Sequence, residues 1–308
     1  MSFDILQEKI RKMKNPTVAG LDARLEYVPE HITKKYIDAY GETRKAAAEA
    51  IFEFNCGLMD ALCDIVPAVK PQAAYYENLG WEGVEMLERT IRYAKEKGFY
   101  VIADIKRGDI GATASAYSEG WLGKSKIGSS MVSAFDADCV TLNGYMGSDA
   151  IKPFLKDAET YDKTAFVLVR TSNPSAIELQ DMVAGDRLVY KVMAELVDQW
   201  GKTTQVGEYG YNRVGAVTGA TYPSDLRLLR KMLPNTFFRV PGYGAQGGTA
   251  EDVHYAFDQY GRGAIVNSSR GIMCAWKKSD KNGADFGEAA RNAAIEMRDA
   301  IKAVTPIL

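Results

Sequence analysis

The sequence predicts an α/β protein in which a single (β/α)8 barrel of the TIM type spans residues 1–308. Eight short apolar runs occur along the chain, and the segments between them include amphipathic stretches of helical period. No Pro-, Gly- or Ser-rich linker divides the sequence, and barrels of this length commonly form one domain. Alternation of eight strands with helices favours a closed barrel over an open sheet.

The elements can be assigned in order along the chain. Residues 1–14 place Phe3, Leu6 and Ile10 at helical spacing, which predicts an extra helix before the first strand. Eight apolar runs bounded by turn residues then predict the strands Thr17–Leu21, Ile65–Val69, Tyr100–Ala103, Cys139–Leu142, Ala165–Val169, Arg213–Val217, Phe237–Val240 and Gly263–Val266. Amphipathic periodicity predicts helices over Thr43–Leu62, Trp81–Lys97, Asp186–Trp200 and Ser224–Met232.

Two predicted connections are longer than is usual between a strand and a helix. Residues 23–41 follow strand 1, and residues 173–212 follow strand 5 and include the helix predicted over 186–200. Both would lie at the rim of the barrel mouth, either as lids or as insertions without a role in a site.

Composition restricts the function classes. The net charge of −2 gives no sign of a nucleic-acid or membrane-surface partner, so an anionic substrate would need a local cluster of positive charge. Residues 1–14 lack the continuous apolar core of a signal peptide, and no run reaches membrane length, from which we expect a cytoplasmic protein.

Cysteine and histidine usage argues against metal sites and histidine-based catalysis. The four cysteines show no Cys-x-x-Cys spacing, which argues against disulfides and structural zinc. Only two histidines, His31 and His254, are present, so a three-histidine metal site is impossible and neither lies in a triad motif. We therefore expect the chemistry to depend on Asp, Lys and Arg.

Polar residues follow nearly every predicted strand. In a (β/α)8 barrel the carboxyl ends of all eight strands meet at one face, where the active site is built. The polar and glycine residues at these ends are Asp22, Lys70, Asp104, Lys106, Asn143, Thr171, Ser172, Thr218, Gly242, Gly244, Ser269 and Arg270. Their convergence predicts a charged site at this face.

The third strand carries the most informative group of charges. Asp104, Lys106 and Asp109 follow a buried apolar run within six residues, and period-2 alternation places Asp104 and Lys106 on one face. Charges at a buried strand end are costly unless they pair with one another or act on a ligand. They form either a structural ion-pair cluster or the centre of a catalytic site.

A candidate phosphate site follows strands 7 and 8. Residues 241–249 contain four glycines, which let backbone N–H groups approach an anion closely. Arg270, in the loop after strand 8, is suited to bidentate phosphate binding, and phosphate sites recur at this position in (β/α)8 barrels. These features predict a phosphorylated small-molecule ligand.

Taken together, these segments resemble the orotidine 5′-phosphate decarboxylase family, and most closely its longer bacterial branch. The resemblance covers Asp104-x-Lys106-x-x-Asp109, followed by Ile110-Gly111-x-Thr113, and extends to the glycine-rich loop at 241–248 and to Ser269-Arg270. Asp22, Lys70 and Ser172 also stand at family positions. The chain departs from the family at Asn173, where a histidine is more often found before the proline.

The resemblance implies decarboxylation of orotidine 5′-phosphate to UMP and CO2, the last step of UMP biosynthesis, without metal or cofactor. In that reading Lys106 protonates C6, Asp104 lies beside the departing carboxylate, and Lys70 and Asp109 complete an alternating Lys-Asp-Lys-Asp array. Asp22 and Lys70 would hold the ribose hydroxyls. The other substrate-binding positions are Thr113, Ser172, Gln246, Gly247 and Arg270, and a homodimer would place Asp109 and Thr113 in the neighbouring subunit's site.

Three other functions share some of these features. Sugar-phosphate decarboxylases and hexulose-phosphate synthases have the Asp-x-Lys-x-x-Asp strand but need Mg²⁺ and lack the Ile-Gly-x-Thr continuation. A Schiff-base aldolase would use Lys70 or Lys106 as an amine, but a lysine between Asp104 and Asp109 is expected to stay protonated. A nucleotide-binding barrel without catalysis is a third alternative, since fold does not fix function.

Overall fold

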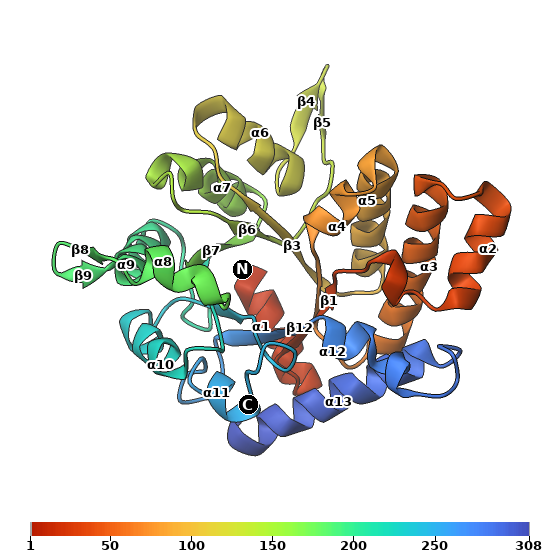
Figure 1. Cartoon of the computed structure of the whole chain (residues 1–308). Helices are drawn as coiled ribbons and strands as arrows, with labels where there is room; N and C mark the ends of the chain where they lie inside the picture. The colour runs from red at the N-terminus through yellow and green to blue at the C-terminus, as the bar shows by residue number, and fades with distance from the viewer. Residues whose placement is uncertain (1, 308) are drawn as a thin grey trace.

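Eight parallel strands close into a barrel in the order β1-β12-β11-β10-β7-β6-β3-β2 (Figure 1). The computed structural model describes residues 2–307. The barrel strands are β1 Thr17–Leu21, β2 Ala68–Pro71, β3 Tyr100–Arg107, β6 Cys139–Leu142, β7 Thr164–Arg170, β10 Val214–Thr218, β11 Phe238–Val240 and β12 Ala264–Ser268. The (β/α)8 architecture predicted from the sequence is confirmed.

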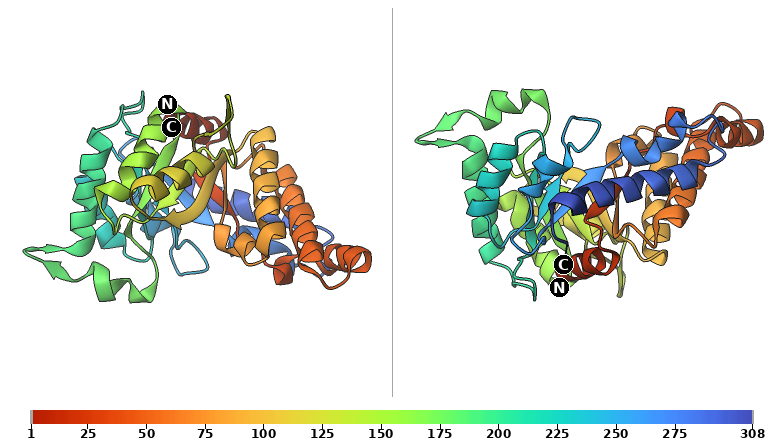
Figure 2. Two further views of the ribbon diagram at one scale, coloured as in Figure 1. Left: turned by 90° about the horizontal axis from the view of Figure 1, so that it is seen from above. Right: turned by 90° about the horizontal axis from the view of Figure 1, so that it is seen from below.

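Helices surround the barrel and follow its strands (Figures 1 and 2). Their bounds are α1 Ser2–Met13, α2 Glu30–Tyr40, α3 Arg44–Leu62, α4 Ala73–Glu77, α5 Gly80–Glu96, α6 Gly111–Trp121, α7 Ser148–Thr160, α8 Ile177–Gln180, α9 Val189–Lys202, α10 Pro223–Met232, α11 Ala250–His254, α12 Arg270–Met273 and α13 Phe286–Val304. Short 3-10 turns are η1 Leu25–Tyr27, η2 Pro174–Ala176 and η3 Ala275–Lys278. Two antiparallel hairpins, β4 Ser125–Ile127 with β5 Ser130–Val132 and β8 Val183–Ala184 with β9 Arg187–Leu188, project from the barrel in Figure 1.

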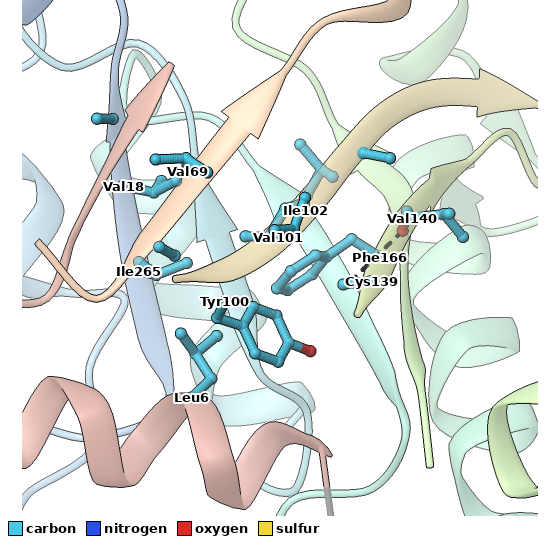
Figure 3. Close-up of a cluster of buried hydrophobic side chains, with 14 of the residues drawn as sticks. Leu6, Val18, Val69, Tyr100, Val101, Ile102, Cys139, Val140, Phe166 and Ile265 are labelled. Carbon is cyan, nitrogen blue, oxygen red and sulfur yellow. Dashed lines mark hydrogen bonds between the residues drawn. The ribbon is translucent and has the colours of Figure 1, made fainter. Parts of the chain in front are cut away.

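The predicted N-terminal helix, α1, covers the amino end of the barrel. The ring of Phe3 stacks on Phe237 at 4.9 Å and packs against Phe166 at 5.2 Å. In Figure 3, Leu6 of α1 lies next to Tyr100 at the start of β3. Because all of these side chains are buried, α1 closes the end of the barrel opposite the carboxyl ends of the strands and adds to the core.

Several strand ends differ from the prediction, and the differences matter for the site. Strand β2 begins at Ala68 rather than Ile65 and continues to Pro71, so Lys70 lies within it. Strand β3 continues past Ala103 to Arg107 and therefore carries Asp104 and Lys106 itself. Hydrophobicity alone ends a strand at its first charge, whereas the backbone pairing continues beyond it.

The two long connections are largely structured. The segment after β1 contains η1 and α2, and the segment after β7 contains η2, α8, the β8–β9 hairpin and α9. The helix predicted from Asp186 begins at Val189, because Arg187 and Leu188 pair in the hairpin. Figure 2 shows the hairpin and α2 at opposite ends of the molecule.

Candidate active site

A cavity of about 680 Å³ opens at the carboxyl ends of the barrel strands. It brings together side chains from the ends of β1, β2, β3, β7, β10, β11 and β12, as expected for this fold. Of the predicted site residues, the cavity is lined by Asp22, Lys70, Asp104, Lys106, Ser172, Gln246 and Arg270.

The floor of the cavity holds a chain of alternating charges. The Nζ atom of Lys70 lies 2.6 Å from Oδ1 of Asp22 and 3.3 Å from Oδ2 of Asp104. The Nζ atom of Lys106 lies 2.6 Å from Oδ1 of Asp104. Because the side chains of Lys70 and Asp104 are almost fully buried, these charges are stabilised by one another rather than by water.

Lys106 reaches Asp104 from an irregular backbone, not from the regular pleat that alternation assumed. Its φ of 48° lies in the left-handed region, and the pairing of β3 with β6 shifts register between Ala103 and Arg107. The backbone N–H of Lys106 donates to Thr141 Oγ1 at 3.0 Å, which holds the bend. Such strained positions concentrate at functional sites. The side chain of Lys106 remains 42% exposed toward the cavity.

Arg239 on β11 is a charged residue of this floor that sequence reasoning missed. Its Nη2 atom lies 3.2 Å from Oδ2 of Asp104 and 3.5 Å from Oδ1 of Asn267, and its side chain is 4% exposed. The sequence did contain a signal, because Arg239 is a charge within the otherwise apolar run 237–240. A buried arginine requires a partner, so its position in a strand indicated a second charged group nearby.

Opposing effects determine the ionisation of Asp104 and Lys106. Burial alone would raise the pKa of Asp104, but the charges of Arg239, Lys70 and Lys106 outweigh it and hold that pKa well below its usual range. Burial lowers the pKa of Lys106, as does Arg239, and the attraction of Asp104 only partly offsets them. The site therefore holds an ionised carboxylate beside an ammonium that gives up its proton more readily than usual.

Asp22 is fixed from both sides. Its Oδ1 accepts from Lys70 and its Oδ2 accepts from Ser269 Oγ at 2.6 Å. Gly20, two residues earlier on β1, makes room for Ser269, because a Cβ there would lie 1.9 Å from the serine Oγ. This arrangement presents carboxylate and ammonium groups at the side of the cavity, where they can bind hydroxyl groups.

The glycine-rich loop and Arg270 lie at another side of the same cavity. Gly242 has a φ of 100°, and a Cβ there would lie 3.3 Å from the Gln246 side-chain oxygen and from Ser172 Cβ. Within residues 2–307 no ion pair holds the exposed side chain of Arg270. Gly247 does not line the cavity, and its N–H donates to the Gly244 carbonyl at 2.8 Å. The free cation and the narrow glycine turn suit an anionic group.

Two predicted site residues lie apart from the others within one chain. Asp109 is half-buried, and Oδ1 of its carboxylate accepts from the backbone N–H of Ile110 at 2.8 Å. Thr113, in the first turn of α6, is exposed. Neither residue lines the cavity, so the single chain does not bring Asp109 into contact with Lys106.

Comparison with known proteins places this arrangement in a family. A family model described as Orotidine 5′-phosphate decarboxylase / HUMPS family matches residues 45–281. Orotidine 5′-phosphate decarboxylase from Caldicellulosiruptor saccharolyticus is 39% identical over 300 residues, covering 97% of each chain. The Clostridium perfringens protein of the same name is 41% identical over 303 residues, covering 98% of each. The chain belongs to the orotidine 5′-phosphate decarboxylase family.

The solved structures agree with this membership. The structure of Leishmania donovani OMP decarboxylase covers 98% of both chains with a TM-score of 0.73 at 29% identity. The description of the matched family covers more than one enzyme, but both relatives above carry the name orotidine 5′-phosphate decarboxylase. The resemblance noted from the sequence is therefore confirmed.

Neither a metal-binding cluster nor a membrane-spanning helix is found in the described part of the chain. Residues 2–307 contain no group of three or more His, Cys, Asp and Glu side chains arranged to hold a metal ion. None of the helices in this part of the chain is long and apolar enough to cross a membrane.

Proposed function

We propose that this chain decarboxylates orotidine 5′-phosphate to UMP and CO2, with Lys106 as the proton donor. The observation that carries the proposal is the Asp22-Lys70-Asp104-Lys106 series of contacts, which shares one cavity with the glycine-rich loop and Arg270. The orotidine 5′-phosphate decarboxylases that resemble the chain over nearly its whole length support the same reaction.

The reaction breaks the bond between C6 and the carboxylate carbon. The electron pair of that bond remains on C6, CO2 leaves, and a proton from Lys106 Nζ adds to C6. The neutral lysine then recovers a proton from solvent. Because the ammonium of Lys106 lies 2.6 Å from Asp104 at the cavity floor, it is already in place before charge develops on C6.

Two electrostatic effects assist this step. Two carboxylates about 4 Å apart repel by roughly 4 kcal/mol at an effective dielectric constant near 20, so Asp104 would destabilise the bound substrate carboxylate. The attraction of the Lys106 ammonium grows as negative charge moves onto C6 and so acts on the transition state. We assign the larger contribution to Lys106, since ground-state destabilisation alone supplies only about three decades of rate.

The remaining residues bind the ends of the substrate. Asp22 and Lys70 hold the ribose hydroxyls, Arg270 binds the phosphate, and Gln246 bridges the phosphate and the pyrimidine. Gly247 lies outside the cavity and would reach the phosphate only when the glycine-rich loop moves. Ser172 lines the cavity beside Gly242 of the glycine-rich loop, where it can contact the pyrimidine. We expect the reaction to need no metal or cofactor.

A homodimer completes the site in this proposal. Asp109 and Thr113 lie outside the cavity of their own chain and are free to reach the site of a second subunit. Three large apolar side chains, Ile110, Tyr145 and Met146, are 53%, 78% and 53% exposed after β3 and β6. Apolar exposure of this kind is typical of a surface that is covered by a partner.

The first test is ultraviolet absorbance of the purified chain with orotidine 5′-phosphate, with and without EDTA. Conversion to UMP at the same rate in both samples supports the proposal. Turnover that is lost with EDTA would contradict the metal-free mechanism, and a chain that neither converts orotidine 5′-phosphate nor binds UMP would reopen the sugar-phosphate alternatives. Tight UMP binding without conversion would instead indicate a nucleotide-binding barrel.

A further inference from the structure

Arg239 is a buried charge of the cavity that the mechanism above does not use. Its side chain is 4% exposed, and it projects from β11 toward Oδ2 of Asp104. A guanidinium that is removed from water in this way is costly unless it is paired. Its Nε atom has no hydrogen-bond partner among the described residues, so the pairing with Asp104 is its principal charged contact.

Asp104 is shared among donors from four strands. Lys106 and Thr141 both contact Oδ1, at 2.6 and 2.7 Å, whereas Lys70 and Arg239 contact Oδ2, at 3.3 and 3.2 Å. A carboxylate offers about four acceptor positions. The four donors therefore fix both oxygens, and Arg239 competes with the lysines for the charge of one carboxylate.

We propose that Arg239 is a positioning residue for the proton transfer and acts through Asp104. By binding Oδ2 it orients the carboxylate and takes up part of its charge, so that the ammonium of Lys106 is held less tightly and passes its proton to C6 more readily. The inference rests on the proposed function, in which Lys106 Nζ supplies that proton while the bond from C6 to CO2 breaks.

The charges around Lys106 give the direction of the effect. Asp104 faces it from β3, Lys70 from β2 and Arg239 from β11, with Asp22 of β1 behind Lys70. With Arg239 present, three cations share the two carboxylates of Asp22 and Asp104. Without Arg239, two lysines share the same two carboxylates. Loss of this arginine therefore strengthens the hold of Asp104 on the Lys106 proton. The lowering of the Lys106 pKa by burial and by Arg239 agrees with this direction.

The test compares Arg239→Met with the wild-type chain across pH. We expect kcat at neutral pH to fall about tenfold or more, a fraction of what a general acid contributes. In the plot of kcat/KM against pH, the fall on the basic side (the basic limb) is expected to move to higher pH, because Lys106 then loses its proton at a higher pH. Arg239→Lys restores a cation near Asp104 and is expected to recover part of kcat and return the limb toward its wild-type position.

A matched control separates this role from general stabilisation. Arg213 is also a buried arginine with one carboxylate partner, Asp162 at 2.7 Å, but it lies at the amino end of β10. Arg213→Met is expected to leave the basic limb of the pH profile unchanged. UMP affinity, measured by calorimetry, is expected to remain within a few-fold of wild type in Arg239→Met, since UMP has no carboxylate at C6.

The outcomes distinguish the two levels of the proposal. An Arg239→Met chain with unchanged kcat and an unchanged basic limb would overturn the role of Arg239. If Arg239→Met lost the same fraction of activity at every pH and also lost UMP affinity, the role proposed for Arg239 would be overturned. Arg239 would then only stabilise the structure of the site. Absence of decarboxylation in the wild-type chain, or full activity of Lys106→Ala, would instead contradict the proposed function.

Discussion

Ser269 Oγ donates a hydrogen bond of 2.6 Å to Asp22 Oδ2, and this contact joins the last strand of the barrel to the first. Strands β1 and β12 pair in parallel, with Ala19 opposite Ser268, so the two side chains stand just beyond the seam that closes the barrel. Asp22 also accepts from Lys70. One of the carboxylates that we assign to substrate binding is therefore fixed by the closure of the fold itself.

Gly20→Ala tests this relationship. The added methyl group would lie 1.9 Å from Ser269 Oγ, so the serine must move and its hydrogen bond to Asp22 is lost. We expect a loss of about 1–3 kcal/mol in the free energy of unfolding, as for overpacked cores, together with a higher KM. Denaturant unfolding and steady-state kinetics measure both. Gly120→Ala is the control, since nothing lies within 4 Å of its Cβ, and wild-type kinetics are expected.

Lys106→Ala is expected to abolish turnover while leaving UMP affinity largely intact. The side chain removed is the proposed proton donor, and UMP has no group at C6 that requires it. Single-turnover kinetics and calorimetry with UMP give the two quantities. A variant that retained substantial decarboxylation would show that another group protonates C6.

Arg270→Ala is expected to raise KM for orotidine 5′-phosphate most strongly and to lower kcat as well. An arginine hydrogen bond to a phosphate contributes about 1.5–3 kcal/mol, which corresponds to roughly 10- to 150-fold in affinity. The remote binding energy also assists the chemical step, so kcat falls with it. If KM and the single-turnover rate both remained at wild-type values, the phosphate would have to bind elsewhere.

Tyr76→Phe tests how the end of β1 is held. The hydroxyl of the buried Tyr76 donates to the Leu21 carbonyl at 3.0 Å and accepts from Asn55 Nδ2 at 3.1 Å. Removing it leaves two buried polar groups without this partner, which costs about 1–3 kcal/mol in the free energy of unfolding. Thermal or denaturant unfolding measures the change. Tyr260→Phe, at a 47% exposed residue, is expected to leave stability unchanged.

The pH dependence of stability follows from Asp104. Its pKa in the folded chain is held below the usual value of about 3.9, so its ionised form stabilises the fold above that pH. This contribution is lost as pH falls below about 4, since the unfolded chain then binds a proton that the folded chain resists. We expect Asp104→Asn to be less stable at neutral pH, with a shallower fall below pH 4 in urea titrations. An equally steep fall would assign the acid sensitivity to other carboxylates.

Sequence patterns were sufficient to predict most of the architecture. The apolar runs identified all eight barrel strands, and the helices over residues 1–14, 43–62, 81–97 and 224–232 agree with α1, α3, α5 and α10 to within one or two residues. Helical periods survive because each helix buries one face against the barrel, whereas the strands appear as continuous apolar runs because both of their faces are buried. The β4–β5 hairpin was not predicted, because its short strands carry mixed polar and apolar residues that are exposed.

The site was harder to predict in its details. Alternation correctly placed Asp104 near Lys106, but the contact depends on the left-handed backbone of Lys106, which no periodicity reveals. Arg239 was hidden within a run classed as apolar, although its charge in a buried strand was a signal that it has a partner. The structure places Asp109 outside the cavity of its own chain, which the spacing of charges along one strand did not predict.

The closure of the barrel also bears on the order in which the chain can fold. Asp22 and Ser269 are 247 residues apart in the sequence, and Phe3 of α1 packs against Phe237. Each end of the barrel therefore depends on contacts between the first part of the chain to be synthesised and the last. Contacts of such high sequence separation slow folding, because a long loop must close before they form. We therefore expect a nascent chain that lacks β12 to expose its first strand and α1, and to become protease-resistant only when synthesis is nearly complete.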